Sequence, residues 1–215
     1  MKPWKRSLPW LAAVAVIALA VSLGNWQLRR ADEKQSLQSQ YDAAEAAAPA
    51  PLGSASDLAA LPSHLPKRVL LNGEFVDSAT VYIDNRMVDG VAGFQVVSAM
   101  RIAPDAPLVL IDRGWAARDA GDRTRLPLVK SVSGPVRIEG LAVALLPRTL
   151  ELGGATDASL GIWQNLDYER FEKASGQTVA RIVVQQTAGS ADGLRRDRPR
   201  LDARVDRHRG YAVQW

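Results

Sequence analysis

An uncharged run from Ser7 to Leu28 constrains this chain more than any other feature, because it is long and apolar enough to cross a bilayer as a helix. Basic residues precede the run, and tryptophans stand near both of its ends, where aromatic side chains usually meet lipid headgroups. These residues are Lys2, Lys5, Arg6, Trp4, Trp10 and Trp26. The sequence therefore predicts a transmembrane anchor over residues 1–28.

A cleavable signal peptide is the alternative interpretation, since Ala18-Leu19-Ala20 offers a small-residue cleavage site. We favour a retained anchor because no turn-forming residue interrupts the run near Ala20. The pattern also passes straight into a helical segment, Gln27 to Ala48, rich in Ala, Gln and Glu. The numbers of basic residues on the two sides of the run differ little. We nevertheless place the amino terminus inside and the body of the chain outside the cytoplasm.

The rest of the chain divides by composition into a helical stem and linker (29–66), a β-rich domain (67–194) and a basic segment (195–215). Short apolar or alternating runs separated by turn residues predict the strands of the middle part. We expect strands at 68–76 (with a turn or bulge at Asn72-Gly73), 80–84, 93–100, 107–115, 132–146 and 178–187, with a turn at Asp89-Gly90 before the third of them. A short helix is expected at Leu166–Ser175, ended by Gly176. The predicted fold class is α+β: an N-terminal transmembrane helix followed by a sandwich-like or barrel-like extracytoplasmic domain.

Composition excludes several kinds of chemistry. The chain has no cysteine, hence no disulfide, thiolate nucleophile or cysteine metal site. Its net charge of +4 is matched by the stretch Arg195–Arg209 alone, where seven arginines face three aspartates. The basic balance is therefore local, and we expect no nucleic-acid partner.

Catalytic motifs are also missing from the sequence. It contains no G-x-S-x-G elbow, phosphate loop or zinc helix motif, and its histidines are His64 and His208. His64 stands in a proline-flanked loop, where a solvated side chain is the usual outcome. The neighbours Asp112-Arg113 and Asp167/Glu169-Arg170 suggest ion pairs on a folded surface. We expect a protein that is not an enzyme; an unrecognised periplasmic enzyme would need a polar pocket built from distant residues.

The cluster Asp112-Arg113-Gly114-Trp115 has two interpretations. It is either a strand end that turns at glycine, with Trp115 packed and Arg113 paired to an acid, or a docking edge, since Arg and Trp are enriched at binding hot spots. Chemistry alone favours the first. At the other end of the chain, residues 206–215 pass from basic to apolar and aromatic, which predicts the leading edge of a second membrane helix.

Four stretches of the chain occur in an order and spacing that can be compared with known families. They are Gly24-Asn25-Trp26-Gln27-Leu28-Arg29-Arg30, Asp112-Arg113-Gly114-Trp115, Ile162-Trp163-Gln164-Asn165-Leu166-Asp167 and His208-Arg209-Gly210-Tyr211-Ala212-Val213-Gln214-Trp215. Together they resemble the Surfeit-locus protein family, assembly factors (chaperones) for haem–copper terminal oxidases of the respiratory chain. Members usually carry a complete second transmembrane helix after the last motif, whereas this sequence ends at its threshold. We therefore expect the second span to be missing or only begun.

The resemblance implies a role in inserting haem a into the catalytic subunit of cytochrome c oxidase, at the cell inner membrane. It implies His208 as axial ligand of the haem iron, with Arg207, Arg209, Tyr211 and Trp215 completing the haem site. Oxidase subunit I and haem a synthase are the expected partners, and the expected docking residues are Trp26, Gln27, Arg29, Arg113, Gly114 and Trp115. The alternative is a scaffold that holds oxidase subunits and binds no haem.

Overall fold

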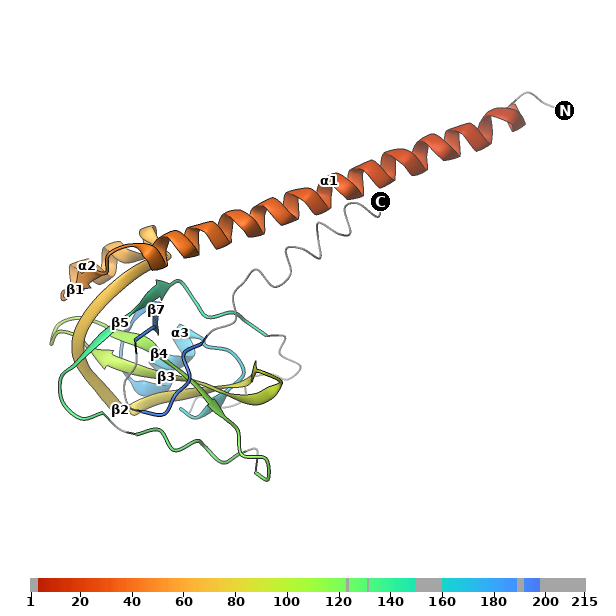
Figure 1. The fold of residues 1–215 in the computed structure, drawn as a ribbon. Helices are drawn as coiled ribbons and strands as arrows, with labels where there is room; N and C mark the ends of the chain where they lie inside the picture. The colour runs from red at the N-terminus through yellow and green to blue at the C-terminus, as the bar shows by residue number, and fades with distance from the viewer. Residues whose placement is uncertain (1–3, 123, 131, 150–159, 189–191, 198–215) are drawn as a thin grey trace. The chain divides into compact units, whose positions relative to one another are not determined.

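The computed structural model describes residues 4–122, 124–130, 132–149, 160–188 and 192–197. The described residues divide into two compact units, one within residues 4–42 and the other within residues 43–197. The predicted fold class is confirmed: a long apolar helix is followed by a β-rich domain (Figure 1).

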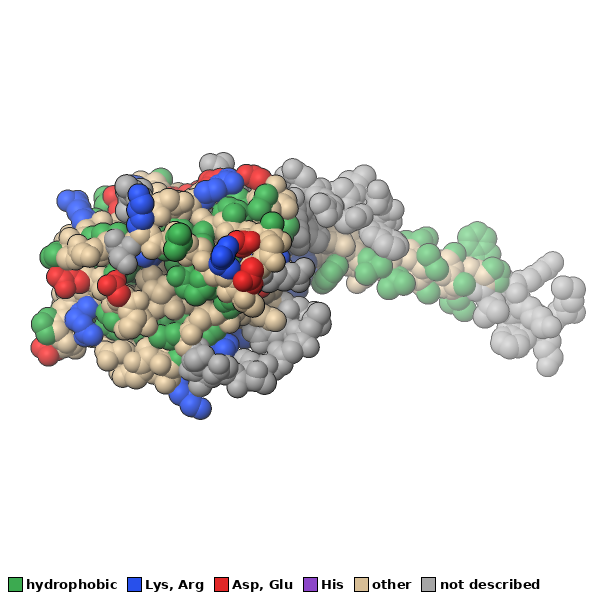
Figure 2. Space-filling model, turned by 90° about the horizontal axis from the view of Figure 1, so that it is seen from below, with side chains coloured by type: hydrophobic (Ala, Val, Ile, Leu, Met, Phe, Trp, Pro, Cys, Tyr) green, Lys and Arg blue, Asp and Glu red, His purple; other side chains and the backbone are tan. Residues whose placement is uncertain are grey.

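Helix α1 runs from Trp4 to Ala46 without a break, 43 residues in all, so it continues through the site where a signal peptide would be cut. At 1.5 Å per residue this is about 65 Å, roughly twice the thickness of a bilayer core. Large apolar side chains of its first half are exposed, as Figure 2 shows in green along the helix. Within the described residues, Pro9–Ala46 is the one helix long and apolar enough to cross a membrane, a test that a signal sequence near an N-terminus also passes.

The β domain is a closed ring of five strands. In ring order they are β2 (Lys67–Val88), β3 (Val91–Arg101), β4 (Leu108–Ala117), β7 (Val179–Gln186) and β5 (Val136–Val143), which pairs again with β2. Neighbours are antiparallel except β4 and β7. Two short strands, β1 (Ala50–Leu52) and β6 (Ile162–Trp163), add to β2 in parallel. The barrel-like alternative is therefore the correct one.

Strand β2 corrects two predictions, namely separate strands at 68–76 and 80–84, and a turn or bulge at Asn72-Gly73 within the first of them. Residues 67–73 pair in regular register with β5, and residues 74–88 pair with β3, so a single strand of 22 residues serves both neighbours. Gly73 stands at the changeover, where a Cβ atom would collide with the carbonyl oxygen of Arg101. The irregularities fall instead between Phe75 and Thr80 and between Ile83 and Arg86. The turn predicted at Asp89-Gly90 is confirmed, with both φ angles positive.

The last part of the predicted stem and linker (29–66) contains short helical elements that cover the barrel core. Helix α2 (Ala55–Ala60) begins with a capping box between Ser54 and Asp57, and the 3₁₀ turn η1 (Leu61–His64) follows. Their leucines join the buried cluster of the barrel strands, whose largest members are Leu52, Leu58, Leu61, Leu71, Met100, Ile111, Ile138 and Ile182. The burial of these leucines stabilises the segment, although its Ala- and Pro-rich composition gave little sign of such contacts.

Helix α3 (Tyr168–Ser175) confirms the predicted helix and its end. Asp167 accepts a hydrogen bond from the backbone N–H of Arg170 at the N-cap, and Gly176 adopts the left-handed conformation beyond the last turn. Phe171 is buried against Trp163, with ring centroids 6.2 Å apart. This helix packs against β7.

Candidate functional site

The motif Asp112-Arg113-Gly114-Trp115 forms a β-bulge inside β4. Val96 pairs with Gly114 and Val97 with Asp112, so Arg113 is the extra residue. The strand does not end at the glycine, as the sequence suggested, but continues to Ala117. Gly114 has φ +136°, and a Cβ atom there would lie 2.5 Å from the carbonyl oxygen of Arg195. Glycine is thus required both by the backbone angle and by a close approach of the chain.

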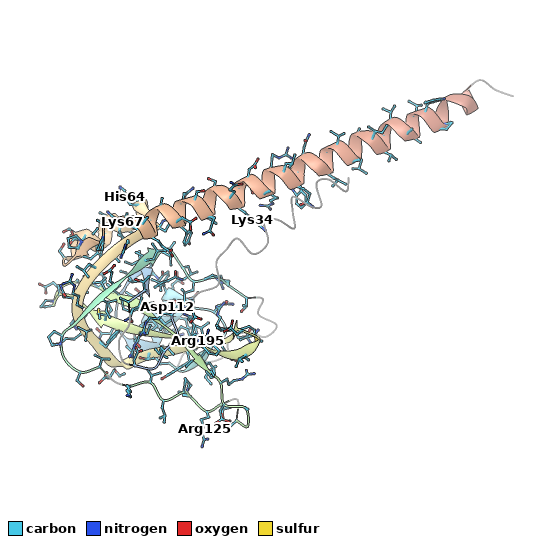
Figure 3. All side chains as sticks on the ribbon, viewed as in Figure 1. Lys34, His64, Lys67, Asp112, Arg125 and Arg195 are labelled. Carbon is cyan, nitrogen blue, oxygen red and sulfur yellow. The ribbon has the colours of Figure 1, made fainter. Side chains whose placement is uncertain are left out.

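Residues 192–197 lie on this bulge. The backbone N–H of Trp115 donates to the Arg195 carbonyl (2.7 Å), and the N–H of Arg195 donates to the Trp115 carbonyl (2.8 Å). The Arg195 guanidinium lies over the Trp115 ring, 5.7 Å from its centroid, and pairs with Asp89 at 2.8 Å and with Asp197. Figure 3 shows Arg195 beside the strand that carries Asp112. We call residues 112–115 together with 192–197 the bulge clamp.

A buried carboxylate holds the bulge clamp together. The Asp192 side chain is fully buried and accepts hydrogen bonds from Arg113 Nη2 (3.3 Å) and Arg196 Nη2 (2.6 Å). One carboxylate therefore neutralises parts of two guanidinium groups that are themselves about nine-tenths buried. Removing one partner of such a pair strongly destabilises the fold, because the other charge stays buried without a counter-charge.

The predicted surface ion pair between Asp112 and Arg113 is wrong. Both residues are buried, and the bulge sends their side chains to different partners. Asp112 accepts a hydrogen bond from Gln95, whereas Arg113 reaches Asp192 and lies over the Phe75 ring, 4.7 Å from its centroid. The part of the first interpretation that the structure confirms is the packed Trp115 and an arginine paired to an acid, although that acid is Asp192.

Trp115 and its surroundings complete the electrostatics of the bulge clamp. The indole Nε1–H donates to the Arg86 carbonyl at 2.8 Å, which fixes the ring against β2. Burial lowers the pKa of the Arg86 guanidinium, and the nearby Asp112 carboxylate opposes that shift. Burial likewise raises the pKa of Tyr82, with Arg113 opposing. The charges of this region thus lie in a partly dehydrated environment, where each pairing has a larger effect than in water.

The stretch Ile162 to Asp167 is also structural in this domain. Trp163 is buried under Arg170, whose guanidinium lies 4.2 Å from the ring centroid. The Asn165 side chain makes two hydrogen bonds of 2.8 Å with the backbone N–H and carbonyl of Thr149. Asp167 caps α3, so its carboxylate serves the helix backbone where an ion pair with Arg170 was predicted.

The predicted site residues fall into three groups. Arg113, Gly114 and Trp115 are buried in the bulge clamp, which leaves little of them for a partner to contact; docking by them stays a prediction. On α1, Trp26 and Arg29 are exposed and Gln27 is half-buried. The predicted haem residues, His208, Arg207, Arg209, Tyr211 and Trp215, lie outside the described residues.

Sequence reasoning missed Asp192, the centre of the bulge clamp. Its only signal was a lone acid in a small-residue stretch just ahead of the arginine-rich run. His64 is exposed, with Nδ1 3.2 Å from the Ala60 carbonyl. In the described ranges, no three His, Cys, Asp or Glu residues are grouped so as to hold a metal ion. A cavity of about 330 Å³ opens beside the start of β5 and is lined by Phe75, Val132, Val136, Arg137, Ile138, Glu139, Gln186 and Ala188.

These features define a class of protein, a small closed β-barrel domain joined to a long apolar helix. A sequence motif in β4 binds residues 192–197, which precede the carboxyl end. The SURF1 family model matches residues 14–215, and the chain belongs to this family, the Surfeit-locus family that its motifs predicted. A SURF1-like protein of Dictyostelium discoideum is similar, with 28% identity over 116 residues, 51% of this chain and 43% of the relative. The match spans less than half the length of that curated relative.

Proposed function

We propose that this chain is a membrane-anchored assembly factor for the haem–copper (cytochrome c) oxidase, and that it assists insertion of haem a into the catalytic subunit. Membership of the SURF1 family is the observation that carries the proposal. The long apolar helix α1 supports the membrane anchor by its length and composition. Oxidase subunit I is the proposed receiver of the haem, and haem a synthase its proposed source.

Haem is cargo in this proposal, and His208 is its proposed axial ligand. Neutral imidazole is a common ligand of haem iron. Arg207 and Arg209 flank His208 and would hold the propionates by charge-assisted hydrogen bonds, while Tyr211 and Trp215 would cover the porphyrin at the membrane edge. The bulge clamp supports this proposal indirectly. It holds residues 192–197 on the barrel, and the proposed haem residues follow that segment in the sequence.

Orientation follows from the sequence argument. The amino terminus lies in the cytoplasm and the β domain on the outer side of the cell inner membrane. Exposed Trp26 and Arg29, with Gln27, would then meet a partner near the membrane surface. A reporter fused after residue 197, active only outside the cytoplasm, tests this orientation.

The deciding experiment is co-expression of the chain with haem a synthesis, followed by spectra of the purified protein. Wild-type protein is expected to carry haem a, and His208→Ala to lose it. His64→Ala is the matched control, because His64 is exposed and makes only a local contact. Unchanged haem retention by His208→Ala would exclude that ligand. Colourless wild-type protein that still co-purifies with oxidase subunits would instead favour the haem-free scaffold.

A further inference from the structure

One face of α1 is covered where the helix leaves the apolar run. Between residues 25 and 43 every residue is exposed except five, which follow one another in steps of four and three. We call these five the stem stripe: Gln27, Ala31, Lys34, Gln38 and Tyr41. Figure 3 marks Lys34 on this part of α1. Steps of four and three are the 3.5-residue repeat of helices that pack side by side.

The cover is most complete at Ala31, which is 1% exposed within a single copy of the chain. The Gln38 Oε1 atom is buried as well, and burial raises the pKa of the Tyr41 hydroxyl. Gln27 and Lys34 each have an interaction partner. A lone helix in water leaves all of its faces open to solvent, so another part of the same chain covers the stem stripe.

The carboxyl segment, residues 198–215, lies outside the described residues, but its sequence carries the same repeat. Its apolar and aromatic residues and its histidine follow one another in steps of four and three, as Leu201, Val205, His208, Ala212 and Trp215. The residues between them include three arginines and two aspartates. Such a pattern predicts an amphipathic helix. Pro199 stands near its start, where proline is favoured.

We propose that the carboxyl segment packs antiparallel on α1, with its own stripe against the stem stripe and His208 opposite Ala31. The direction follows from the topology, since α1 leads away from the membrane and the carboxyl segment leads back to it. The register follows from the two membrane boundaries. It sets Leu28, where the apolar run ends, beside Tyr211, where the carboxyl segment becomes apolar.

The side chains of the two stripes fit this register. The smallest member of the stem stripe, Ala31, faces the imidazole of His208, so a small side chain meets a large one. Lys34 lies opposite Val205, with the carboxylates of Asp202 and Asp206 on either side of that valine. The positive charge of Lys34 is thereby brought to the acidic part of a segment that is otherwise basic.

A second copy of the chain is the poorer occupant of the stem stripe. The cover of Ala31 is present within a single copy, and a parallel pair of stripes would bring two Lys34 side chains together. The inference rests on the proposed function only in placing both segments on the outer side of one membrane. It does not depend on haem or on the oxidase.

Disulfide mapping tests the register, because the natural chain has no cysteine. Lys34→Cys with Val205→Cys should form an internal disulfide on oxidation in native membranes, since facing positions bring Cα atoms within reach of an S–S bond. Ser36→Cys with Val205→Cys is the control and should form none, because Ser36 is exposed on the other face of α1. Mass spectrometry identifies the linked peptides. Disulfide-linked dimers in place of the internal bond, equal yields from both pairs, or no internal bond would each overturn the proposal.

The reactivity of a thiol at position 31 supplies the quantitative arm. Ala31→Cys should react with a maleimide more slowly than Ser36→Cys. Adding Val205→Asp should speed the reaction at position 31 at least about tenfold, since one buried valine is typically worth that factor. Ala203→Asp, between the stripe positions of the carboxyl segment, should leave it unchanged.

A reaction at position 31 that stays slow with Val205→Asp would show that another part of the chain covers the stem stripe, and would refute the packing alone. Wild-type protein without haem a in the deciding experiment would refute haem delivery and leave these labelling rates as they are. The two proposals therefore fail separately.

Discussion

At the scale of single residues, two arginines of the bulge clamp pair with carboxylates that lie far away in the sequence. Arg113 pairs with Asp192, which also binds the nearby Arg196, and Arg195 pairs with Asp89 in the β2–β3 turn. The two settings differ in burial. Asp192 is fully buried, whereas the Asp89 side chain is 75% exposed. Similar pairs should therefore contribute very differently to stability.

Asp192→Asn should destabilise the β domain by about 3–5 kcal/mol, because it leaves two buried guanidinium groups without their shared counter-charge. Urea unfolding followed by tryptophan fluorescence measures the change. Asp89→Asn is the control and should alter the free energy of unfolding by about 0.5 kcal/mol or less. Equal effects of the two substitutions would show that Asp192 does not hold the bulge clamp.

Asp119 should titrate below the ordinary aspartate pKa of about 3.9. The N–H of Gly121 lowers its pKa most, followed by Arg125 and the N–H of Asp122. Since the pKa is lowered on folding, the turn at residues 119–125 is fully stabilised above about pH 4 and loses this contribution as pH falls through the lowered value. Carbon-13 NMR titration of the Asp119 carboxyl measures it. Arg125→Ala should raise the midpoint only part of the way, because the two backbone donors remain.

At the scale of elements, the bulge in β4 explains why a four-residue motif contains glycine and tryptophan side by side. Gly114 lets residues 192–197 approach the strand, and Trp115 pairs with Arg195 through two backbone hydrogen bonds. The segment is therefore an extra edge partner of β4, attached where the strand is irregular. Loss of the glycine should detach it.

Gly114→Ala should expose the chain at Arg195 and Arg196 to trypsin, because its Cβ atom has no room beside the Arg195 carbonyl and its φ angle is strained. Limited proteolysis with mass spectrometry should show cleavage at least about tenfold faster than in wild type, if detachment costs about 1.4 kcal/mol or more. Gly134→Ala also has a positive φ but open space around its Cβ, and should leave this cleavage rate unchanged.

At the scale of the whole molecule, a long helix and a barrel are stabilised in different ways. The barrel buries its apolar side chains within itself, and α2 and η1 cover its core. The first half of α1 exposes its large apolar side chains, which is unfavourable in water and favourable in a bilayer. The membrane is thus the expected partner of that half of α1.

Val16→Arg should weaken membrane insertion by about 3 kcal/mol, since a charge would stand near the middle of the apolar run. Carbonate extraction should release more of this variant than of wild type. Leu37→Arg introduces the same charge in the stem, beyond the run, and should stay in the membrane pellet. A pellet fraction unchanged by Val16→Arg would argue against a transmembrane α1.

The sequence by itself determined the features that depend on neighbours along the chain. The apolar run predicted α1, Gly176 predicted the end of α3, and Asp89-Gly90 predicted a turn, because caps, turns and periodicity are local physics. The joining of two predicted strands into β2, and the ordering of α2, escaped it because pairing with β3 and β5 and burial of leucines are non-local.

Only the tertiary structure shows where the side chains of the central motif lie. Side-chain chemistry alone favoured a strand end over a docking edge for this run of Asp, Arg, Gly and Trp, but it does not say which groups lose their water. The fold brings Asp192 and Arg195 to that run and buries it, so the motif holds the segment on which His208 follows. Burial and long-range pairing are properties of the closed barrel, and no stretch of sequence carries them alone.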